Sequence, residues 1–187
     1  MSGREHIQPG WLGQGPKTYL VMSNHQSHYD VAVIYYVLGS KMRMVAKREL
    51  FNVPVFGTAM KAAGFISVDR GNNASAIASL EEARHALESG TPIWIAPEGT
   101  RSPTGELMPF KKGGFVIAVE TGTPILPVSI AGTREVLPAH GRRSRAGVEV
   151  YVTIHPPVDP KRWADKDPKQ ARDALLAEVR TAIASGL

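Results

Sequence analysis

The 187-residue sequence contains no cysteine. This absence excludes disulfide bonds, thiolate zinc sites, cysteine-bound iron–sulfur clusters and a cysteine nucleophile, but it fits several compartments equally. Long apolar runs are missing too, because the longest extends only from Val31 to Leu38. A membrane-spanning helix needs roughly 18 such residues. Residues 1–17 lack the apolar stretch of a signal peptide, so neither a span nor a secretion signal is predicted.

Three motifs of common catalytic sites are also absent. Without G-x-x-x-x-G-K-[ST] there is no P-loop, and without G-x-G-x-x-G there is no dinucleotide-binding fingerprint. Without G-x-S-x-G there is no nucleophile elbow of the α/β-hydrolase type, which makes a serine acyl-enzyme less favoured.

Acidic residues are in the minority. Lys and Arg number 22 against 17 Asp and Glu, which gives a formal net charge of +5 and a pI near 9.6. This balance favours an anionic partner, namely nucleic acid, a phosphorylated substrate or an anionic membrane surface. A cluster of Arg134, Arg142, Arg143 and Arg145 lies in a loop bounded by glycine and proline. It is typical of a solvated face and also of a surface that attracts anionic head groups.

The apolar pattern predicts an α/β fold, with strands alternating with helices over most of the length. Strands are expected at 18–23, 43–46, 65–68, 92–96, 125–130 and 148–154, and helices at 31–38, 53–63, 73–89, 114–121 and from Asp167 onward. We find no repeat, low-complexity tract or linker. The sequence therefore predicts a single domain over 1–187, with a central, mostly parallel or mixed sheet flanked by helices.

Two histidines and an aspartate directly follow the first predicted strand, in NHQSHYD (24–30). A histidine can accept a proton near pH 7, and a carboxylate can fix its tautomer and stabilise its charged form. If His25 lies in a loop and Asp30 in the first helical turn, the chain can fold back and join them. The spacing alone is equally typical of loop histidines next to a charged residue at a helix start.

Charged residues also follow two later strands. PEGTRS (97–102) offers a tight turn and a guanidinium, and GFISVDR (64–70) ends in a carboxylate and a guanidinium. Each segment alone also fits a solvated turn, as does KREL (47–50). Because the ends of parallel strands meet at one edge of a sheet, a base, a carboxylate and two guanidiniums would converge there. Proton abstraction beside a phosphate needs such a set.

Two other hypotheses use the same residues. His25, His28 and Asp30 could ligate a metal in a hydrolase, although H-x-x-H-x-D is one residue longer than the familiar H-x-H-x-D. The net charge alone would also suit a non-catalytic protein that binds anionic lipid or nucleic acid.

Taken together, these blocks resemble those of the lysophospholipid acyltransferases, specifically the 1-acyl-sn-glycerol-3-phosphate acyltransferases. NHQSHYD, GFISVDR, PEGTRS and TPILPVSI (123–130) occur in the family's order, and KREL and FKKGGF (110–115) resemble its intervening segments. The resemblance covers residues 18 to about 130 and implies an α/β acyltransferase fold.

The resemblance implies that His25 is the general base and Asp30 its orienting partner. His25 would deprotonate the free 2-hydroxyl of lysophosphatidic acid, which would attack an acyl thioester directly and give phosphatidic acid and a thiol. Pro127 would shape the acyl-binding side. The glycerol phosphate would be held by Glu98, Gly99, Thr100 and Arg101, with Arg70 and Lys47.

The family also implies partners and a location. These are lysophosphatidic acid, acyl-CoA or acyl-carrier protein as co-substrate, and an anionic membrane surface, with no metal, cofactor or nucleic acid. Another lysophospholipid or an ornithine-type lipid stays open as acceptor. We expect a peripheral enzyme at the cytoplasmic face of a membrane. Because SGREHI, which resembles the segment after the family's membrane anchor, begins at Ser2, the anchor is expected to be short or missing from this chain.

Overall fold

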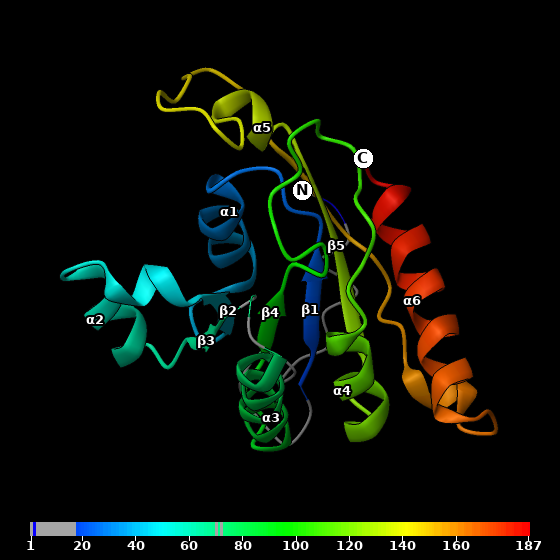
Figure 1. The fold of residues 1–187 in the computed structure, drawn as a ribbon. Coiled ribbons are helices and arrows are strands. Elements are labelled where there is room, and N and C mark those ends of the chain that lie inside the picture. Colours follow the sequence, from blue (N-terminus) through cyan, green and yellow to red (C-terminus); the bar gives the residue numbers. More distant parts are fainter. Residues whose placement is uncertain (1, 3–17, 70, 72) are drawn as a thin grey trace.

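A computed structural model describes residue 2, residues 18–69, residue 71 and residues 73–187. Within these residues the chain forms one mixed sheet in the order β3-β2-β4-β1-β5-β6, flanked by helices (Figure 1). All neighbouring strands run parallel except β6, which pairs antiparallel with β5. The strands are β1 (Leu20–Ser23), β2 (Arg43–Lys47), β3 (Ile66–Val68), β4 (Ile93–Ile95), β5 (Ile125–Ala131) and β6 (Tyr151–Ile154).

The connecting segments are mostly helical, as parallel strands require. The α-helices are α1 (Tyr29–Leu38), α2 (Phe56–Ala62), α3 (Asn73–Glu88), α4 (Gly113–Thr121), α5 (Thr133–Val136) and α6 (Pro168–Ala184). Two 3₁₀ turns, η2 (Arg48–Asn52) and η3 (Pro160–Trp163), complete the described elements.

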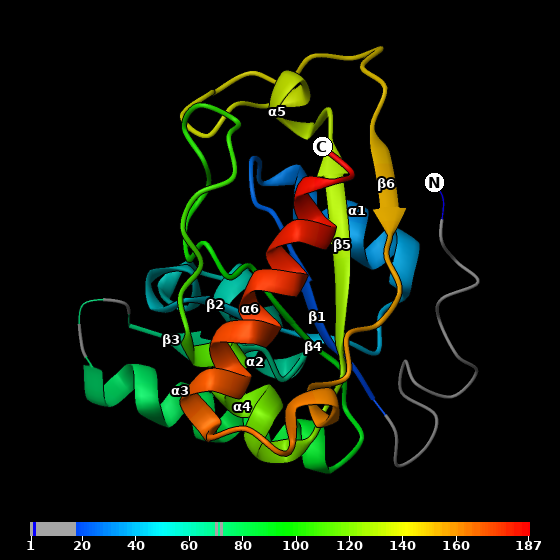
Figure 2. The same ribbon diagram turned by 90° about the vertical axis from the view of Figure 1, so that its right-hand side faces the viewer.

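Alternate residues of the buried strands face two separate apolar cores. In β1, Val21 packs in a core with residues of α1 and α2, whereas Leu20 and Met22 pack with residues of α3, α4 and α6. The sheet therefore lies between two helical layers, with α3, α4 and α6 on the face turned toward the viewer in Figure 2. This double cover explains why β1 and β5 read as continuous apolar runs.

The predicted fold class is confirmed, and the element boundaries shift for local reasons. The helix expected over 53–63 begins at Phe56, because Pro54 and Val55 form a tight turn before it. The last strand is shorter than 148–154 and lies at a sheet edge, as its alternation indicated. The final helix has its predicted N-terminus, where the Asp167 side chain accepts hydrogen bonds from two backbone N–H groups and Pro168 follows.

Among the described residues, no helix combines the length and the apolar character that crossing a membrane would take. The carboxyl ends of β1 and β4, neighbours at the centre of the sheet, lead directly into NHQSHYD and PEGTRS. The fold therefore brings these two segments to the same edge of the sheet.

Candidate active site

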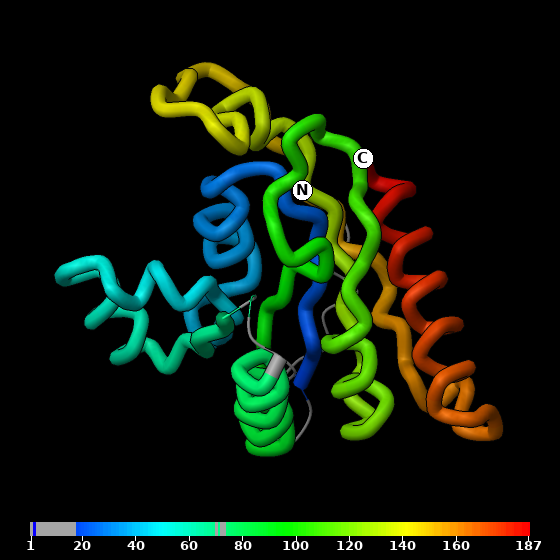
Figure 3. The backbone as a smooth tube through the Cα atoms, viewed as in Figure 1, coloured from blue at the N-terminus to red at the C-terminus, as the bar shows by residue number. Residues whose placement is uncertain are grey.

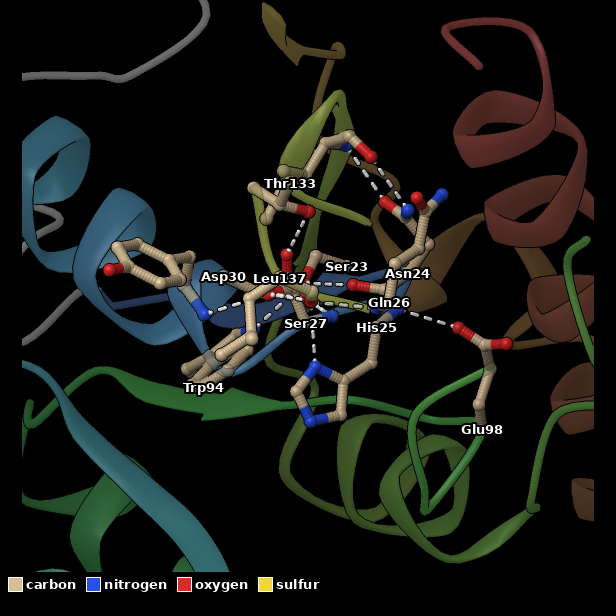
Figure 4. Close-up of polar contacts among 12 residues, drawn as sticks. Ser23, Asn24, His25, Gln26, Ser27, Asp30, Trp94, Glu98, Thr133 and Leu137 are labelled. Atoms are coloured by element: carbon tan, nitrogen blue, oxygen red, sulfur yellow. Dashed lines mark hydrogen bonds and ion pairs between the residues drawn. The ribbon is translucent and has the colours of Figure 1, made fainter. Parts of the chain in front are cut away.

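His25 and Asp30 are in direct contact in the loop between β1 and α1. The Nδ1 atom of His25 lies 2.7 Å from Oδ2 of Asp30, and the imidazole points its other nitrogen away from the carboxylate (Figure 4). His25 is half-buried with 16% of its side chain exposed, whereas Asp30 is fully buried. Asp30 is the second residue of α1, so the loop closes back on the first helical turn.

The Asp30 carboxylate is fixed by further hydrogen bonds. Its Oδ2 also accepts from the backbone N–H groups of Gln26 at 2.7 Å and Ser27 at 2.9 Å. Its Oδ1 accepts from the Thr133 hydroxyl at 2.5 Å. These donors offset the burial of the negative charge and set the orientation of the oxygen that faces His25.

The strand end before His25 is fastened to the neighbouring strands. The Asn24 amide donates to the carbonyl of Ile130 in β5 and accepts from its N–H, both at 2.8 Å. Ser23 accepts a hydrogen bond from the indole N–H of Trp94 in β4 at 3.0 Å, and the Trp94 ring lies edge-on to His25. Sequence reasoning did not identify this role of Asn24. Its partner is 106 residues away, which no local pattern indicates.

The PEGTRS segment holds the backbone of His25. Oε1 of Glu98 accepts from the His25 N–H at 2.7 Å, and the N–H of Ser102 donates to the His25 carbonyl at 2.7 Å. Oε2 of Glu98 accepts from the N–H of Met108 at 2.9 Å. Burial raises the pKa of Glu98, while the two backbone hydrogen bonds act in the opposite direction. Glu98 therefore joins three chain segments around the loop between β1 and α1.

A cavity of about 660 Å³ opens beside His25. Its wall includes the polar and basic residues His25, His28, Lys47, Thr100, Arg101 and Lys111. It also includes the apolar residues Met22, Met44, Leu50, Val68, Leu80, Trp94 and Ile95. The cavity can accept a ligand with an anionic end and an apolar end, with the imidazole at its wall.

The structure brings four of the predicted phosphate-binding residues to this cavity: Lys47, Gly99, Thr100 and Arg101. Gly99 has a φ of +74°, which favours glycine, and its missing Cβ leaves room for the Lys111 side chain. Lys47 also pairs with Glu49 at 2.7 Å, at the surface.

Two described residues that the sequence analysis expected at the site, Glu98 and Pro127, do not line the cavity. Glu98 is not among its lining residues, and both carboxylate oxygens accept backbone N–H groups. Arg70 lies outside the described residues. Pro127, expected on the acyl side, sits within β5 opposite Met22 and does not line the cavity.

Sequence reasoning missed Lys111 and gave His28 no role except as a metal ligand. Both line the cavity. Partial burial and the nearby Arg101 guanidinium lower the pKa of His28, which favours a neutral imidazole there. Lys111 could have been suspected from FKKGGF, whereas only the fold places His28 near Arg101.

Within the described part of the chain, no group of three or more His, Asp or Glu side chains is arranged to hold a metal ion. His25 instead uses its Nδ1 atom to bind Asp30. The metallohydrolase hypothesis therefore has no set of ligands at His25, His28 and Asp30.

Known proteins are similar to this chain in sequence. The family model described as Acyltransferase matches residues 1–131. A chloroplastic 1-acyl-sn-glycerol-3-phosphate acyltransferase from Brassica napus is 33% identical over 166 residues, which are 89% of this chain and 45% of that protein. The alpha 1-acyl-sn-glycerol-3-phosphate acyltransferase from Homo sapiens is 34% identical over 157 residues, which are 83% and 53% of the two chains. This chain thus spans about half the length of these curated relatives.

A solved structure is also similar to this chain, in both fold and sequence. The crystal structure of the 1-acyl-sn-glycerophosphate acyltransferase from Thermotoga maritima matches with a TM-score of 0.72 and 32% sequence identity, over 96% of this chain and 70% of that one. The resemblance inferred from the four sequence blocks is confirmed. Because the family model covers more than half of the chain and the solved relative shares its fold, this chain belongs to the Acyltransferase family.

Proposed function

We propose that this chain transfers a fatty acyl group from an acyl thioester to the free 2-hydroxyl of 1-acyl-sn-glycerol-3-phosphate. The products would be phosphatidic acid and a thiol. The observation that carries the proposal is the His25–Asp30 pair at the wall of a cavity lined by both basic and apolar side chains. The names of the relatives from Brassica napus and Thermotoga maritima support the choice of acceptor.

In the proposed reaction His25 acts as a general base. Because Asp30 accepts the hydrogen bond at Nδ1, that nitrogen carries the proton and Nε2 can accept another. Nε2 removes the proton of the substrate hydroxyl as its oxygen forms a bond to the thioester carbonyl carbon. The tetrahedral intermediate then collapses, the C–S bond breaks, and the imidazolium returns the proton to the leaving thiolate. Asp30 stabilises the imidazolium meanwhile and no acyl-enzyme forms.

The acceptor's phosphate would bind the basic residues of the cavity wall. Arg101 offers a planar pair of donors and Lys47 a point charge, with the Thr100 hydroxyl beside them. Arg70 stays a proposed ligand. We assign Glu98 to positioning His25, because a second anion would repel phosphate and its oxygens are already used. The acyl chains would lie against the apolar residues of the wall.

Acyl-CoA or acyl-carrier protein would supply the acyl group, and the step needs no other cofactor. Other lysophospholipids and an ornithine-type lipid remain alternative acceptors. We place the reaction at the cytoplasmic face of a membrane, with the protein bound peripherally, because the proposed substrate and product are both lipids.

An assay of thiol release tests this proposal. Acyl-CoA and acyl-carrier protein are supplied in parallel against a panel of lysophospholipids, and turnover is expected with 1-acyl-sn-glycerol-3-phosphate. Arg101→Gln should raise the KM for this acceptor about 10- to 100-fold, because a charge-assisted bond to phosphate is lost. The exposed Arg84→Gln in α3 serves as the matched control. An unchanged KM would remove Arg101 from the phosphate site, and turnover only with an unphosphorylated acceptor would overturn the substrate assignment.

Glu98→Gln separates positioning from phosphate binding. Glutamine keeps the shape and one acceptor oxygen, but its amide leaves the buried N–H of either His25 or Met108 without a partner. We expect the free energy of unfolding to fall by about 1–3 kcal/mol. Part of this loss is offset, because burial disfavours the charged carboxylate. In steady-state kinetics kcat should fall while the KM for the acceptor stays within twofold, roughly. A change confined to KM would instead mean that Glu98 contacts the substrate.

A further inference from the structure

The turn between η2 and α2 is strained and exposed. Val55 has a φ of +65° and a ψ of −55°, and the N–H of Phe56 donates to the carbonyl of Pro54 at 2.7 Å. This is a γ-turn with positive φ at its centre, which is rare for any residue and especially unfavourable for a β-branched one. Such strain persists only where the surrounding structure enforces it, and it is concentrated at functional positions.

The backbone around Val55 enforces the turn. The N–H of Gly57 donates to the carbonyl of Val53 at 2.8 Å, and a Cβ at position 57 would lie only 2.0 Å from the carbonyl oxygen of Phe51. The first turn of α2 is therefore packed directly on η2. As a result Val55 is held with 84% of its surface exposed and Phe56 with 51%.

Helix α1, a neighbour of α2 on the same side of the sheet, also carries exposed apolar side chains. Tyr29 and Tyr36 lie seven residues apart and so on the same side of α1, and Tyr36 is 90% exposed. Tyr35 stacks on Phe65, which follows α2, so the two helices are neighbours. We call these exposed residues the α1–α2 face. It contains five of the eight large exposed hydrophobic side chains in the described residues, namely Tyr29, Tyr36, Val53, Val55 and Phe56.

The charge around the α1–α2 face is positive. The hydroxyl of Tyr29 donates to Ser144 at 2.9 Å, which places the exposed Arg142, Arg143 and Arg145 next to α1. Acidic residues are absent from the sequence over 31–48, 52–68 and 136–148. Figure 3 shows α2 and this arginine-containing loop projecting on the same side of the sheet.

We propose that the α1–α2 face docks onto an anionic lipid surface, with Val55 and Phe56 inserted and the arginine loop on the head groups. Apolar and tyrosine side chains beside arginines suit the interface between acyl chains and head groups. Lys47 and Leu50, just before the strained turn, line the active-site cavity. Docking through this face therefore brings the cavity to the lipid. The inference rests on the proposed function in assigning a lipid substrate to that cavity.

Vesicle sedimentation tests the docking. The probe is vesicles of phosphatidylcholine and phosphatidylglycerol in equal parts, mixed with the whole chain. Val55→Gly combined with Phe56→Ser should weaken partitioning about tenfold or more, because two apolar side chains no longer leave water. Changing Arg142, Arg143 and Arg145 to Gln should weaken partitioning to these vesicles. The partitioning that remains should depend less on salt concentration. Tyr151→Ser removes an exposed aromatic residue of β6, at the opposite edge of the sheet, and should bind like the parent.

Folding is checked by thermal melting, where Val55→Gly alone should melt no lower than the parent because glycine relieves the strain. Turnover of a water-soluble short-chain acceptor should be unchanged in the double variant. If the parent shows no turnover, the proposed function fails but the vesicle result still stands. If the folded double variant partitions like the parent, the docking proposal is overturned. It is equally overturned if the substitutions only convert a dimer of this chain into a monomer.

Discussion

Replacing His25 by alanine is expected to lower kcat by about 10²- to 10⁴-fold, which is the usual contribution of a general base. In the proposed mechanism the imidazole takes the proton of the substrate hydroxyl, and the ring nitrogen that does not contact Asp30 faces away from the carboxylate. The KM for the acceptor should change much less, because the proposed role of His25 is to accept the proton and not to bind the phosphate. Single-turnover measurement of thiol release gives the chemical step directly.

A surface histidine supplies the control for this result. His85→Ala in α3 removes an imidazole that is 70% exposed, and kcat should stay at the parent value. If His25→Ala transferred acyl groups at the parent rate, the general-base mechanism would be wrong. The melting temperature of His25→Ala shows whether the variant is folded. We expect it to fold, because 16% of the His25 side chain is exposed and its backbone hydrogen bonds remain.

Asp30→Asn is expected to lower kcat on the order of 10²-fold while leaving the loop in place. Two backbone N–H groups and His25 all donate to the same Asp30 oxygen. An asparagine must therefore place its carbonyl oxygen there, which preserves the histidine tautomer. What is lost is the negative charge that stabilises the imidazolium. The measurement is kcat together with a crystal structure or NMR spectrum of the loop.

Two further variants separate the effects of the Asp30 hydrogen bonds from the effect of its charge. Asp30→Ala leaves the buried N–H groups of Gln26 and Ser27 without partners, and the free energy of unfolding should fall by about 2–5 kcal/mol. Thr133→Val removes only the hydrogen bond to the other carboxylate oxygen, at about 1 kcal/mol and with a smaller loss of activity. A fully active Asp30→Asn would show that the charge does not assist the reaction.

Much of this fold can be predicted from the sequence, because the patterns that indicate it involve neighbouring residues. The apolar strand at 18–23, the helix opened by Asp167-Pro168 and the alternation over 148–154 depend on neighbours in the sequence, and the structure contains each element. The pairing of His25 with Asp30 was also a local inference, and the distance of 2.7 Å fits it. The order of the four sequence blocks also indicated the family.

The remaining features depend on contacts that no local pattern carries. Glu98 was grouped with the phosphate ligands because it lies in PEGTRS, yet its oxygens are taken up by N–H groups 73 and 10 residues away. The γ-turn at Val55 escaped prediction because a β-branched residue rarely adopts a positive φ. The strain there is held by the contact of Gly57 with η2, which only the folded chain reveals.

The hydrogen bonds that hold Asn24, Asp30 and His25 in place also have a consequence for folding. Their partners Ile130, Thr133 and Glu98 lie 106, 103 and 73 residues further along the chain. Closing loops of this length costs chain entropy before the contacts are made, so the pairing of distant strands must come first. The contact between His25 and Asp30 can form between nearby residues. The hydrogen bonds that hold the pair in place form only when β5 and the segment after β4 have joined β1. Catalytic competence should therefore be among the last properties that the refolding chain gains.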